Sequence, residues 1–256
     1  MRFKVVIPAR YASSRLPGKP LLEIAGKPMI QHVYERAVDS GADEVIIATD
    51  DSRIAECVRS FSAQVCMTAS HHASGTERIA EVVRCYAWKE DTIVVNLQGD
   101  EPRMPAALLA QVAQDMNTHT AANMTTLAGK IISREQLFDP HTVKVVTDIA
   151  GYALYFSRAP LPWHRDEFLR ENGSLPVDTQ FLRHIGLYAY RAGFLEQYIN
   201  WPQSQLERAE SLEQLRVLWH GGRIHVSEAL KEPGHGVDTQ DDINRVKRQF
   251  RSDKYE

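Results

Sequence analysis

The chain has 256 residues, and 43% of them are hydrophobic, so it can bury a sizeable core as one large α/β domain or as a domain with a lobe. Its formal net charge of −3 excludes a general attraction to nucleic acid or to an anionic membrane. The three cysteines lack C-x-x-C spacing, which indicates reduced thiols and neither a disulfide framework nor a zinc site. We find no signal-peptide pattern and no stretch near the ~18 apolar residues of a transmembrane helix, so we expect a cytoplasmic protein without membrane insertion.

The first half of the chain alternates short strand patterns with helix patterns. Apolar runs predict buried strands at 3–7, 44–49, 65–67 and 92–97. Helical spacing predicts helices at 28–37 and 76–88, and Asp50-Asp51-Ser52 offers an N-cap to a helix between them. This alternation implies right-handed crossovers and a mainly parallel sheet, which is an α/β fold.

After about residue 120 strands dominate, as in a mixed sheet. Strands are predicted at 123–132, 143–147, 151–157 and 185–190. The polar stretch 163–178 is typical of a long loop or arm, and two helices are predicted after it, at 206–219 and 239–250. Because no repeat or linker interrupts the chain, we predict one domain over 1–256, with functional halves at about 1–120 and 121–256.

The loop that follows the first predicted strand is rich in basic and small residues. It reads Ile7-Pro8-Ala9-Arg10-Tyr11-Ala12-Ser13-Ser14-Arg15-Leu16-Pro17-Gly18-Lys19-Pro20. Open α/β folds bind ligands at the carboxyl ends of their strands, small residues let backbone N–H groups approach an anion, and three basic side chains supply positive charge. The loop therefore predicts a polyphosphate site, with a solvated basic turn as the alternative. It lacks both the Walker A spacing and a G-x-G-x-x-G fingerprint.

An acidic residue follows the strongest predicted strand, in Gln98-Gly99-Asp100-Glu101-Pro102. The carboxyl ends of parallel strands share one edge, so Asp100 should face the same crevice as the basic loop. A carboxylate beside a polyphosphate site favours Mg²⁺, held together with phosphate oxygens and water. The alternative is an N-cap carboxylate for a helix that starts near Pro105.

Two further segments have both a functional and a structural interpretation. Ser74-Gly75-Thr76-Glu77-Arg78 precedes a predicted helix, so it suits either an anion or base-edge site or a capped helix start. Asp238, in Gly236-Val237-Asp238-Thr239, is on the pattern alone more typical of an N-cap. The adjacent pair His71-His72 has no third ligand at a metal-binding spacing, so we interpret both as loop histidines.

The second half carries residues suited to an acidic sugar. Arg158 and Arg165 follow a predicted strand, and guanidinium groups bind carboxylates with two parallel hydrogen bonds. His184 and Tyr188 share one face of the strand at 185–190, although such a strand is more often a structural edge. Glu210 and Glu213 lie three apart on the predicted helix 206–219 and so share a face, where solvated charges are the default interpretation.

Several strings, in one order from Val5 to about Val246, resemble the CMP-Kdo synthetase (3-deoxy-manno-octulosonate cytidylyltransferase) family. They are R-Y-A-S-S-R-L-P-G-K-P-L, S-G-T-E-R, N-L-Q-G-D-E-P, A-L-Y-F-S-R-A, R-H-I-G-L-Y-A-Y-R-A-G-F and L-E-Q-L-R-V-L-W. The resemblance implies a Rossmann-like nucleotidyltransferase fold with a mainly parallel central sheet and a mixed-sheet second half. It also implies that CTP and 3-deoxy-D-manno-octulosonate (Kdo) give CMP-Kdo and pyrophosphate for lipopolysaccharide biosynthesis, in a homodimer whose interface lies in the second half.

The resemblance also implies a role for each candidate residue. The catalytic residues would be Arg15, Lys19, Asp100 and Asp238, and the last two would hold Mg²⁺. The nucleotide would contact Ala9, Arg10, Ser13, Ser14, Arg15, Lys19, Ser74, Gly75, Thr76, Arg78 and Gln98. Kdo would contact Gln98, Arg158, Arg165, His184, Tyr188, Glu210 and Glu213. Two alternatives remain, namely a nucleotidyltransferase for another acidic sugar and a non-catalytic nucleotide-sugar binding module.

Overall fold

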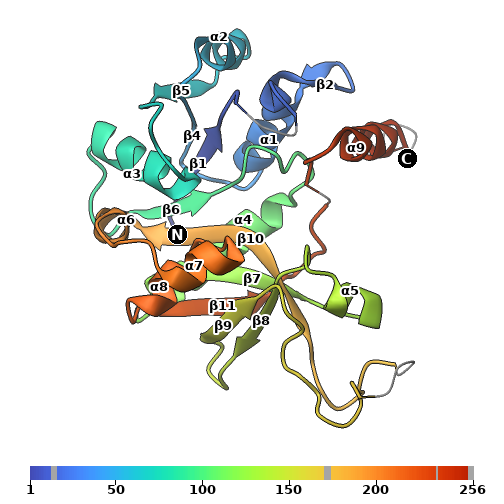
Figure 1. The fold of residues 1–256 in the computed structure, drawn as a ribbon. Helices are drawn as coiled ribbons and strands as arrows, with labels where there is room; N and C mark the ends of the chain where they lie inside the picture. Colours follow the sequence, from blue (N-terminus) through green and yellow to red (C-terminus); the bar gives the residue numbers. More distant parts are fainter. Residues whose placement is uncertain (13–15, 170–173, 235, 253–256) are drawn as a thin grey trace.

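The computed structural model describes residues 1–12, 16–169, 174–234 and 236–252, and these form a central sheet with helices on both faces (Figure 1). Nine of the described strands make one sheet, whose main path runs β11-β7-β10-β6-β1-β4-β5. Their bounds are β1 Lys4–Ala9, β4 Glu44–Thr49, β5 Gln64–Met67, β6 Ile93–Asn96, β7 Met124–Lys130, β8 Lys144–Thr147, β9 Ala153–Ser157, β10 Leu182–Arg191 and β11 Ile224–Glu228. The small hairpin of β2 Glu23–Ile24 and β3 Lys27–Pro28 lies apart from this sheet.

The main path of the sheet is parallel except at β10, and the second half of the chain adds further antiparallel pairs. Strands β5, β4, β1 and β6 are parallel neighbours, and β11 is parallel to β7. The reversed strand β10 lies between β6 and β7 and pairs antiparallel with both, while β8 and β9 extend from its beginning. The prediction of a mainly parallel sheet with a mixed second half is therefore confirmed.

The helices enclose two hydrophobic clusters, one on each face of the sheet. Their bounds are α1 Met29–Val38, α2 Ser52–Ser60, α3 Gly75–Cys85, α4 Ala106–Thr118, α5 Arg134–Phe138, α6 Ala192–Ile199, α7 Gln205–Glu210, α8 Gln214–Trp219 and α9 Gln240–Ser252, with a short 3₁₀ helix at Lys19–Leu21. One cluster joins α1, α2 and α4 to the sheet, and the other joins α3, α6 and α8 to it. In β1, Val5 and Ile7 face the first cluster and Val6 faces the second, as expected for a strand buried on both sides.

The C-terminal helix brings a distant segment onto the first loop. Ile243 and Val246 of α9 are buried together with Ile24, Met29 and Val237 in a third apolar cluster. This packing places the residues just before α9 beside the 3₁₀ helix, which is the reason that Asp238 can reach the N-terminal half of the site.

The predicted helix at 206–219 is wrong as a single element. It is two short helices, α7 and α8, because Ser211 adopts the left-handed conformation with φ 52° and ψ 48°. Helical propensity does not reveal this break, since every residue in the stretch, Ser211 included, is compatible with a continuous helix. The sequence patterns also did not predict α5, α6 or β11.

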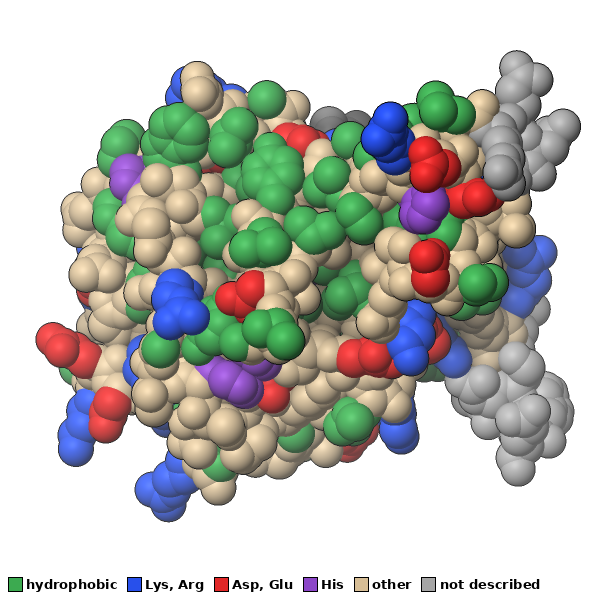
Figure 2. Space-filling view, turned by 90° about the horizontal axis from the view of Figure 1, so that it is seen from below, with side chains coloured by type: hydrophobic (Ala, Val, Ile, Leu, Met, Phe, Trp, Pro, Cys, Tyr) green, Lys and Arg blue, Asp and Glu red, His purple; other side chains and the backbone are tan. Residues whose placement is uncertain are grey.

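Hydrophobic side chains gather on the lower face of the molecule, as Figure 2 shows. The segment 130–180 supplies large hydrophobic residues that are at least half exposed, namely Ile132, Ile149, Leu154, Trp163, Leu169 and Val177. Among the described residues no helix has the length and apolar character needed to cross a membrane.

Candidate active site

A cavity of about 440 Å³ lies at the carboxyl ends of β1 and β6. The candidate residues that line it are Ala9, Arg10, Lys19, Ser74, Gly75, Gln98, Asp100, Glu213 and Asp238. These come from the first loop, the start of α3, the end of β6, the start of α8 and the segment before α9. The predicted meeting of the basic loop and Asp100 at one sheet edge is confirmed. The candidates Ser13, Ser14 and Arg15 lie outside the described residues.

Two glycines allow the backbone to take this shape. Gly18 has φ 69°, which few other residues adopt, and its N–H donates to the carbonyl of Tyr11 at 3.0 Å, which closes the loop just before Lys19. At Gly99 a Cβ atom would lie 2.8 Å from the carbonyl oxygen of Pro8, so only glycine lets the end of β6 approach the end of β1. Both glycines thus place functional side chains, although they carry none themselves.

Lys19 joins three parts of the chain that are far apart in sequence. Its Nζ lies 2.7 Å from Oδ2 of Asp100 and 3.2 Å from Oδ1 of Asp238, and it donates to the carbonyl of Val237 at 2.7 Å. The N–H of Val237 in turn donates to the carbonyl of Asp100 at 2.9 Å. The side chain of Lys19 is only 12% exposed, so its ammonium group is held between the two carboxylates.

The helix-capping alternatives for the two aspartates are wrong. Helix α4 has no side-chain hydrogen bond at its N-cap, so Asp100 does not cap it. At the start of α9 the hydroxyl of Thr239 accepts from the N–H of Asp242, and the Asp242 carboxylate accepts from the N–H of Thr239. This is a capping box, and it leaves the carboxylate of Asp238 facing Lys19.

The charge around Lys19 fits a divalent cation. Burial is the main cause that raises the pKa of Glu101 to about 8, and the nearby Asp100 and Asp238 contribute to this increase while Lys19 opposes it. The negative charges of Asp100 and Asp238 thus reach Glu101, although the Lys19 ammonium group lies between the two aspartates. Within the described chain no group of three or more His, Cys, Asp or Glu could hold a metal by protein ligands alone. Asp100 and Asp238 therefore suit Mg²⁺, which is usually held by one or two carboxylates with phosphate oxygens and waters.

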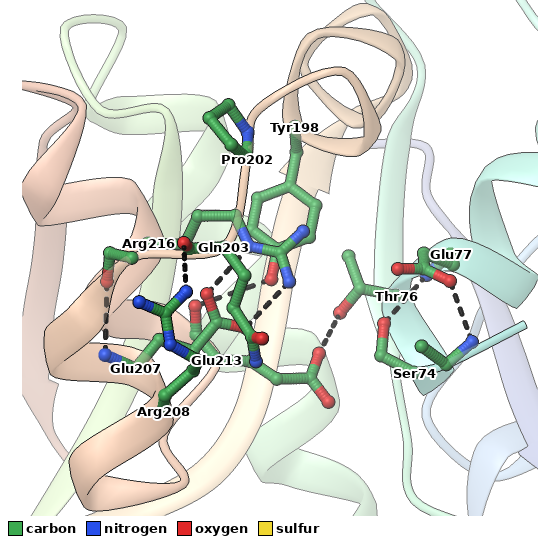
Figure 3. Close-up of polar contacts among 12 residues, drawn as sticks. Ser74, Thr76, Glu77, Tyr198, Pro202, Gln203, Glu207, Arg208, Glu213 and Arg216 are labelled. Carbon is green, nitrogen blue, oxygen red and sulfur yellow. Dashed lines mark hydrogen bonds and ion pairs between the residues drawn. The ribbon is translucent and has the colours of Figure 1, made fainter.

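The start of α3 forms the wall between this cavity and a second one. The hydroxyl of Ser74 caps α3 by accepting from the N–H of Glu77 at 3.2 Å. Thr76 Oγ1 donates to Oε2 of Glu213 at 2.9 Å, across the gap between α3 and α8 (Figure 3). The capped-helix interpretation of this segment is thus correct, and it coexists with a place in the cavity wall for Ser74.

Arg78 lies beneath the site and lines neither cavity. Its fully buried guanidinium donates from Nη1 to the hydroxyl of Thr68 and lies 3.3 Å from Oδ1 of Asp50. Burial lowers its pKa, and the carboxylate of Asp50 opposes that shift. The positive charge of Arg10 also lowers the pKa of Arg78, so the two guanidinium groups are close enough to repel each other.

The second cavity is larger, about 1090 Å³, and adjoins the first. Both are lined by Gly75, Gln98 and Glu213. His184 and Tyr188 of β10 line the larger cavity on one strand face, as predicted. Burial lowers the pKa of His184 to about 3 and raises the pKa of Tyr188, so both side chains are uncharged at neutral pH. The hydroxyl oxygen of Thr126 lies 3.0 Å from Nε2 of His184.

Glu210 and Glu213 do not share a helix face, because the break at Ser211 separates them. Glu210 accepts from the hydroxyl of Ser157 at 2.6 Å and from the N–H of Arg158 at 2.9 Å, so it holds the end of β9. Glu213 instead points toward Thr76, and burial raises its pKa. The default interpretation as a solvated charge is therefore wrong for Glu210, whereas Glu213 is an exposed residue whose carboxylate is hydrogen-bonded to Thr76.

The two arginines predicted to contact a sugar lie outside the lining of the larger cavity. Arg158 donates from Nε to the carbonyl of Glu210 at 2.8 Å and from Nη1 to the carbonyl of Pro140 at 2.9 Å. Arg165 is exposed in the arm that follows β9. The cations that do line the cavity, Lys130 and Arg183, were not singled out from the sequence, although Arg183 directly precedes the predicted His184.

Comparison with known proteins assigns this site to a family. The sequence model of the family described as cytidylyltransferase matches residues 4–225. The chain belongs to the cytidylyltransferase family. It is 58% identical over 248 residues to an Idiomarina loihiensis protein named 3-deoxy-manno-octulosonate cytidylyltransferase, which covers 97% of this chain and 98% of that protein. A Pasteurella multocida protein of the same name is 56% identical over 251 residues, which covers 96% of this chain and 97% of that protein.

Solved structures agree with this cytidylyltransferase assignment. A structure of CMP:2-keto-3-deoxy-manno-octonic acid synthetase complexed with CTP matches 99% of this chain and 100% of its own, at 42% identity and a TM-score of 0.89. A cytidylyltransferase from Leptospira borgpetersenii, at 16% identity and a TM-score of 0.60, matches 96% of this chain and 85% of its own and shares the fold alone.

Proposed function

We propose that this cytidylyltransferase converts CTP and Kdo into CMP-Kdo and pyrophosphate, the activation step that precedes use of Kdo in lipopolysaccharide. The observation that carries the proposal is the Lys19 ammonium group held by Asp100 and Asp238 in a cavity that adjoins a larger one. This arrangement suits a triphosphate beside a second substrate. The names of the relatives that match almost the whole chain supply the identity of nucleotide and sugar.

In this reaction the protein mainly positions the two substrates and neutralises their negative charge. The anomeric hydroxyl of the sugar attacks the α-phosphorus in line with departing pyrophosphate. Arg10 and Lys19 line the smaller cavity and would neutralise the negative charge of the triphosphate and of the leaving pyrophosphate. Gln98 and Glu213 line both cavities, so they are placed to orient the sugar hydroxyl toward the nucleotide.

Dependence on Mg²⁺ forms part of the proposal, with Asp100 and Asp238 as the residues that would hold the ion. When bound, Mg²⁺ would polarise the phosphoryl oxygens and lower the pKa of a coordinated hydroxyl. Asp238 reaches the site through the packing of α9, and the Val237 N–H bond to Asp100 fixes its backbone. Lys19 would then neutralise phosphate charge beside the ion.

A homodimer in the cytoplasm completes the proposal. The exposed hydrophobic residues of segment 130–180 include Leu154, which is 63% exposed on β9, and contiguous apolar surface of this kind favours a protein interface. We expect light scattering to give twice the monomer mass for the wild type and the monomer mass for Leu154→Glu.

The described cysteines are free, as expected in a reducing cytoplasm, and cell fractionation would test that location.

Pyrophosphate release measured with Mg²⁺ and CTP tests the activity. The sugars to compare are Kdo, 8-amino-Kdo, N-acetylneuraminate and a sugar 1-phosphate, with UTP as the nucleotide control. Release with CTP and Kdo supports the proposal. Release only with another sugar would contradict the sugar assignment, and the absence of release with every pair would contradict enzymatic function.

A further inference from the structure

Arg53, near the start of α2, stacks on Tyr11 of the basic loop although it lines neither cavity. Its Cζ atom lies 3.3 Å from the centre of the Tyr11 ring, which is a cation–π contact. Tyr11 stands between Arg10 and Ala12, and both of these line the smaller cavity. The contact therefore joins a helix outside the site to the loop that would bind the triphosphate, so the inference below rests on the proposed function.

Asp51 fixes the guanidinium group of Arg53. Nε of Arg53 donates to Oδ1 of Asp51 at 3.0 Å and Nη2 donates to Oδ2 at 2.6 Å, so the two planar groups form a bidentate pair. The carboxylate is itself held, because it caps α2 by accepting from the backbone N–H of Arg53. The side chains of Arg53 and Asp51 are 57% and 18% exposed. Bidentate geometry is the case in which an exposed ion pair still restrains its partners.

The ring of Tyr11 also contacts the other end of the basic loop. A Cβ atom at Gly18 would lie 3.2 Å from Cε2 and Cζ of Tyr11, so the glycine packs directly on the ring. The N–H of Gly18 donates to the carbonyl of Tyr11 at 3.0 Å, and Lys19 follows immediately. Tyr11 is partly buried against the apolar cluster that joins α2 to the sheet. One aromatic ring thus contacts both Arg53 and the glycine that precedes Lys19.

Support of this kind acts on the nucleotide-free protein. If a loop holds its binding conformation for only part of the time, the apparent Kd rises by the reciprocal of that fraction. Once CTP is bound, its phosphates hold the loop, so further support adds little to the bound state. Loss of the contact between Arg53 and Tyr11 should therefore raise the KM for CTP and leave kcat almost unchanged.

We propose that Arg53 is a positioning residue of the nucleotide site, which acts by holding the ring of Tyr11 in place. The ring in turn supports the described ends of the basic loop, from which Arg10 and Lys19 line the smaller cavity. Because Arg53 lines neither cavity, the proposal gives it no contact with a substrate.

The first test compares the wild type with Arg53→Met, which keeps a long side chain and removes the guanidinium group. We expect the KM for CTP at saturating Kdo to rise about two- to fivefold, the range typical of exposed cation–π contacts, while kcat changes by less than about 1.5-fold. Isothermal titration calorimetry should give the same rise in the Kd of CTP. An unchanged KM would contradict the proposal, and so would a decrease confined to kcat.

Arg59→Met is the matched control, because Arg59 is an exposed arginine of the same helix that lines neither cavity. Both variants remove one positive charge from α2, so a general attraction for the triphosphate would weaken in both. We expect the KM for CTP of Arg59→Met to stay within about 1.5-fold of the wild type. Equal increases in the two variants would mean a general electrostatic effect and would overturn the proposal.

A double-variant cycle shows whether Arg53 acts through Tyr11. Tyr11→Leu removes the ring and should raise the KM for CTP at least as much as Arg53→Met does. The variant with both changes should have the same KM as Tyr11→Leu alone, because the contact is already lost. If the two increases multiply instead, Arg53 does not act through Tyr11.

A measurement without nucleotide separates this proposal from the proposed function. The Gly18 N–H is hydrogen-bonded to the carbonyl of Tyr11, so its hydrogen exchange reports whether the loop stays closed. Arg53→Met should speed that exchange by about two- to fivefold, and Arg59→Met should not change it. A wild type that does not bind CTP would contradict the proposed function, whereas an unchanged exchange rate in Arg53→Met would contradict the role of Arg53.

Discussion

Thr76 at the start of α3 and Glu213 at the start of α8 are joined by a 2.9 Å hydrogen bond, although 137 positions separate them in the sequence. Figure 3 shows this bond between α3 and α8. Glu213 lines both cavities, so the bond lies where they meet. Burial raises the pKa of Glu213, and the hydroxyl of Thr76 opposes that shift. One hydrogen bond thus connects the nucleotide half of the site with the sugar half.

Replacing Thr76 by valine tests this connection, because the shape is kept and the donor is lost. The lost hydrogen bond is partly buried, and such a bond typically contributes about 0.5–1.5 kcal/mol, so we expect a decrease of about that size in the free energy of unfolding. We also expect a higher KM for both CTP and Kdo. Urea unfolding and steady-state kinetics measure the two effects. Thr76→Ser retains the hydroxyl and should behave like the wild type, so equal behaviour of the valine and serine variants would contradict the role of the bond.

Asp100→Asn and Asp238→Asn test the magnesium site. Each variant should lower turnover by about 10- to 100-fold and require more Mg²⁺ for half-maximal pyrophosphate release, because an amide is a weaker ligand than a carboxylate. EDTA should abolish wild-type turnover, and added Mg²⁺ should restore it. Asp242→Asn is the matched control, since Asp242 caps α9. An unchanged Mg²⁺ titration in both site variants would remove the metal from the mechanism.

The buried ion pair behind Glu213 should carry a large part of the local stability. Nη2 of Arg216 lies 2.6 Å from Oε1 of Glu207, their side chains are 8% and 3% exposed, and the guanidinium stacks 4.6 Å from the ring centre of Tyr198. Arg216→Met leaves a buried carboxylate unpaired, which should lower the free energy of unfolding by about 3–5 kcal/mol. The double variant Glu207→Leu/Arg216→Met should recover most of that loss in urea unfolding. A single variant as stable as the double would contradict this account.

His184 should make the stability depend on pH. Its pKa falls from an ordinary 6.5 to about 3 in the folded protein because of burial. Below pH 6.5 the unfolded chain binds a proton that the folded protein does not bind, so stability falls as the pH drops from about 6.5 towards 3. The slope is at most about 1.4 kcal/mol per pH unit.

His184→Gln removes this titration, so its melting temperature should vary less than that of the wild type between about pH 4.5 and 6.5. The control is His141→Gln, at an exposed histidine of the same cavity, which should keep the wild-type dependence. Identical pH profiles for wild type and His184→Gln would show that burial of His184 does not produce the effect.

Local sequence determined the strands that are buried on both faces and the loops that follow them. Continuous apolar runs such as Val5 to Ile7 can only be stable between two layers of helices, so the sheet and its functional edge could be predicted. Lys19 and Asp100 follow such strands, and their meeting required no knowledge beyond the direction of the strands.

Tertiary structure alone decided where distant or ambiguous residues lie. The packing of α9 on Ile24 and Met29 brings Asp238 to Lys19, and a capping pattern could not reveal it. The left-handed Ser211 turns Glu213 toward Thr76, although the sequence there suits an unbroken helix. Which arginine lines the larger cavity depends on the partners that bind Arg158 and on the space left by Gly129 beside Arg183. Periodicity records only which face of an element is apolar, whereas contacts between elements arise from packing that no local pattern contains.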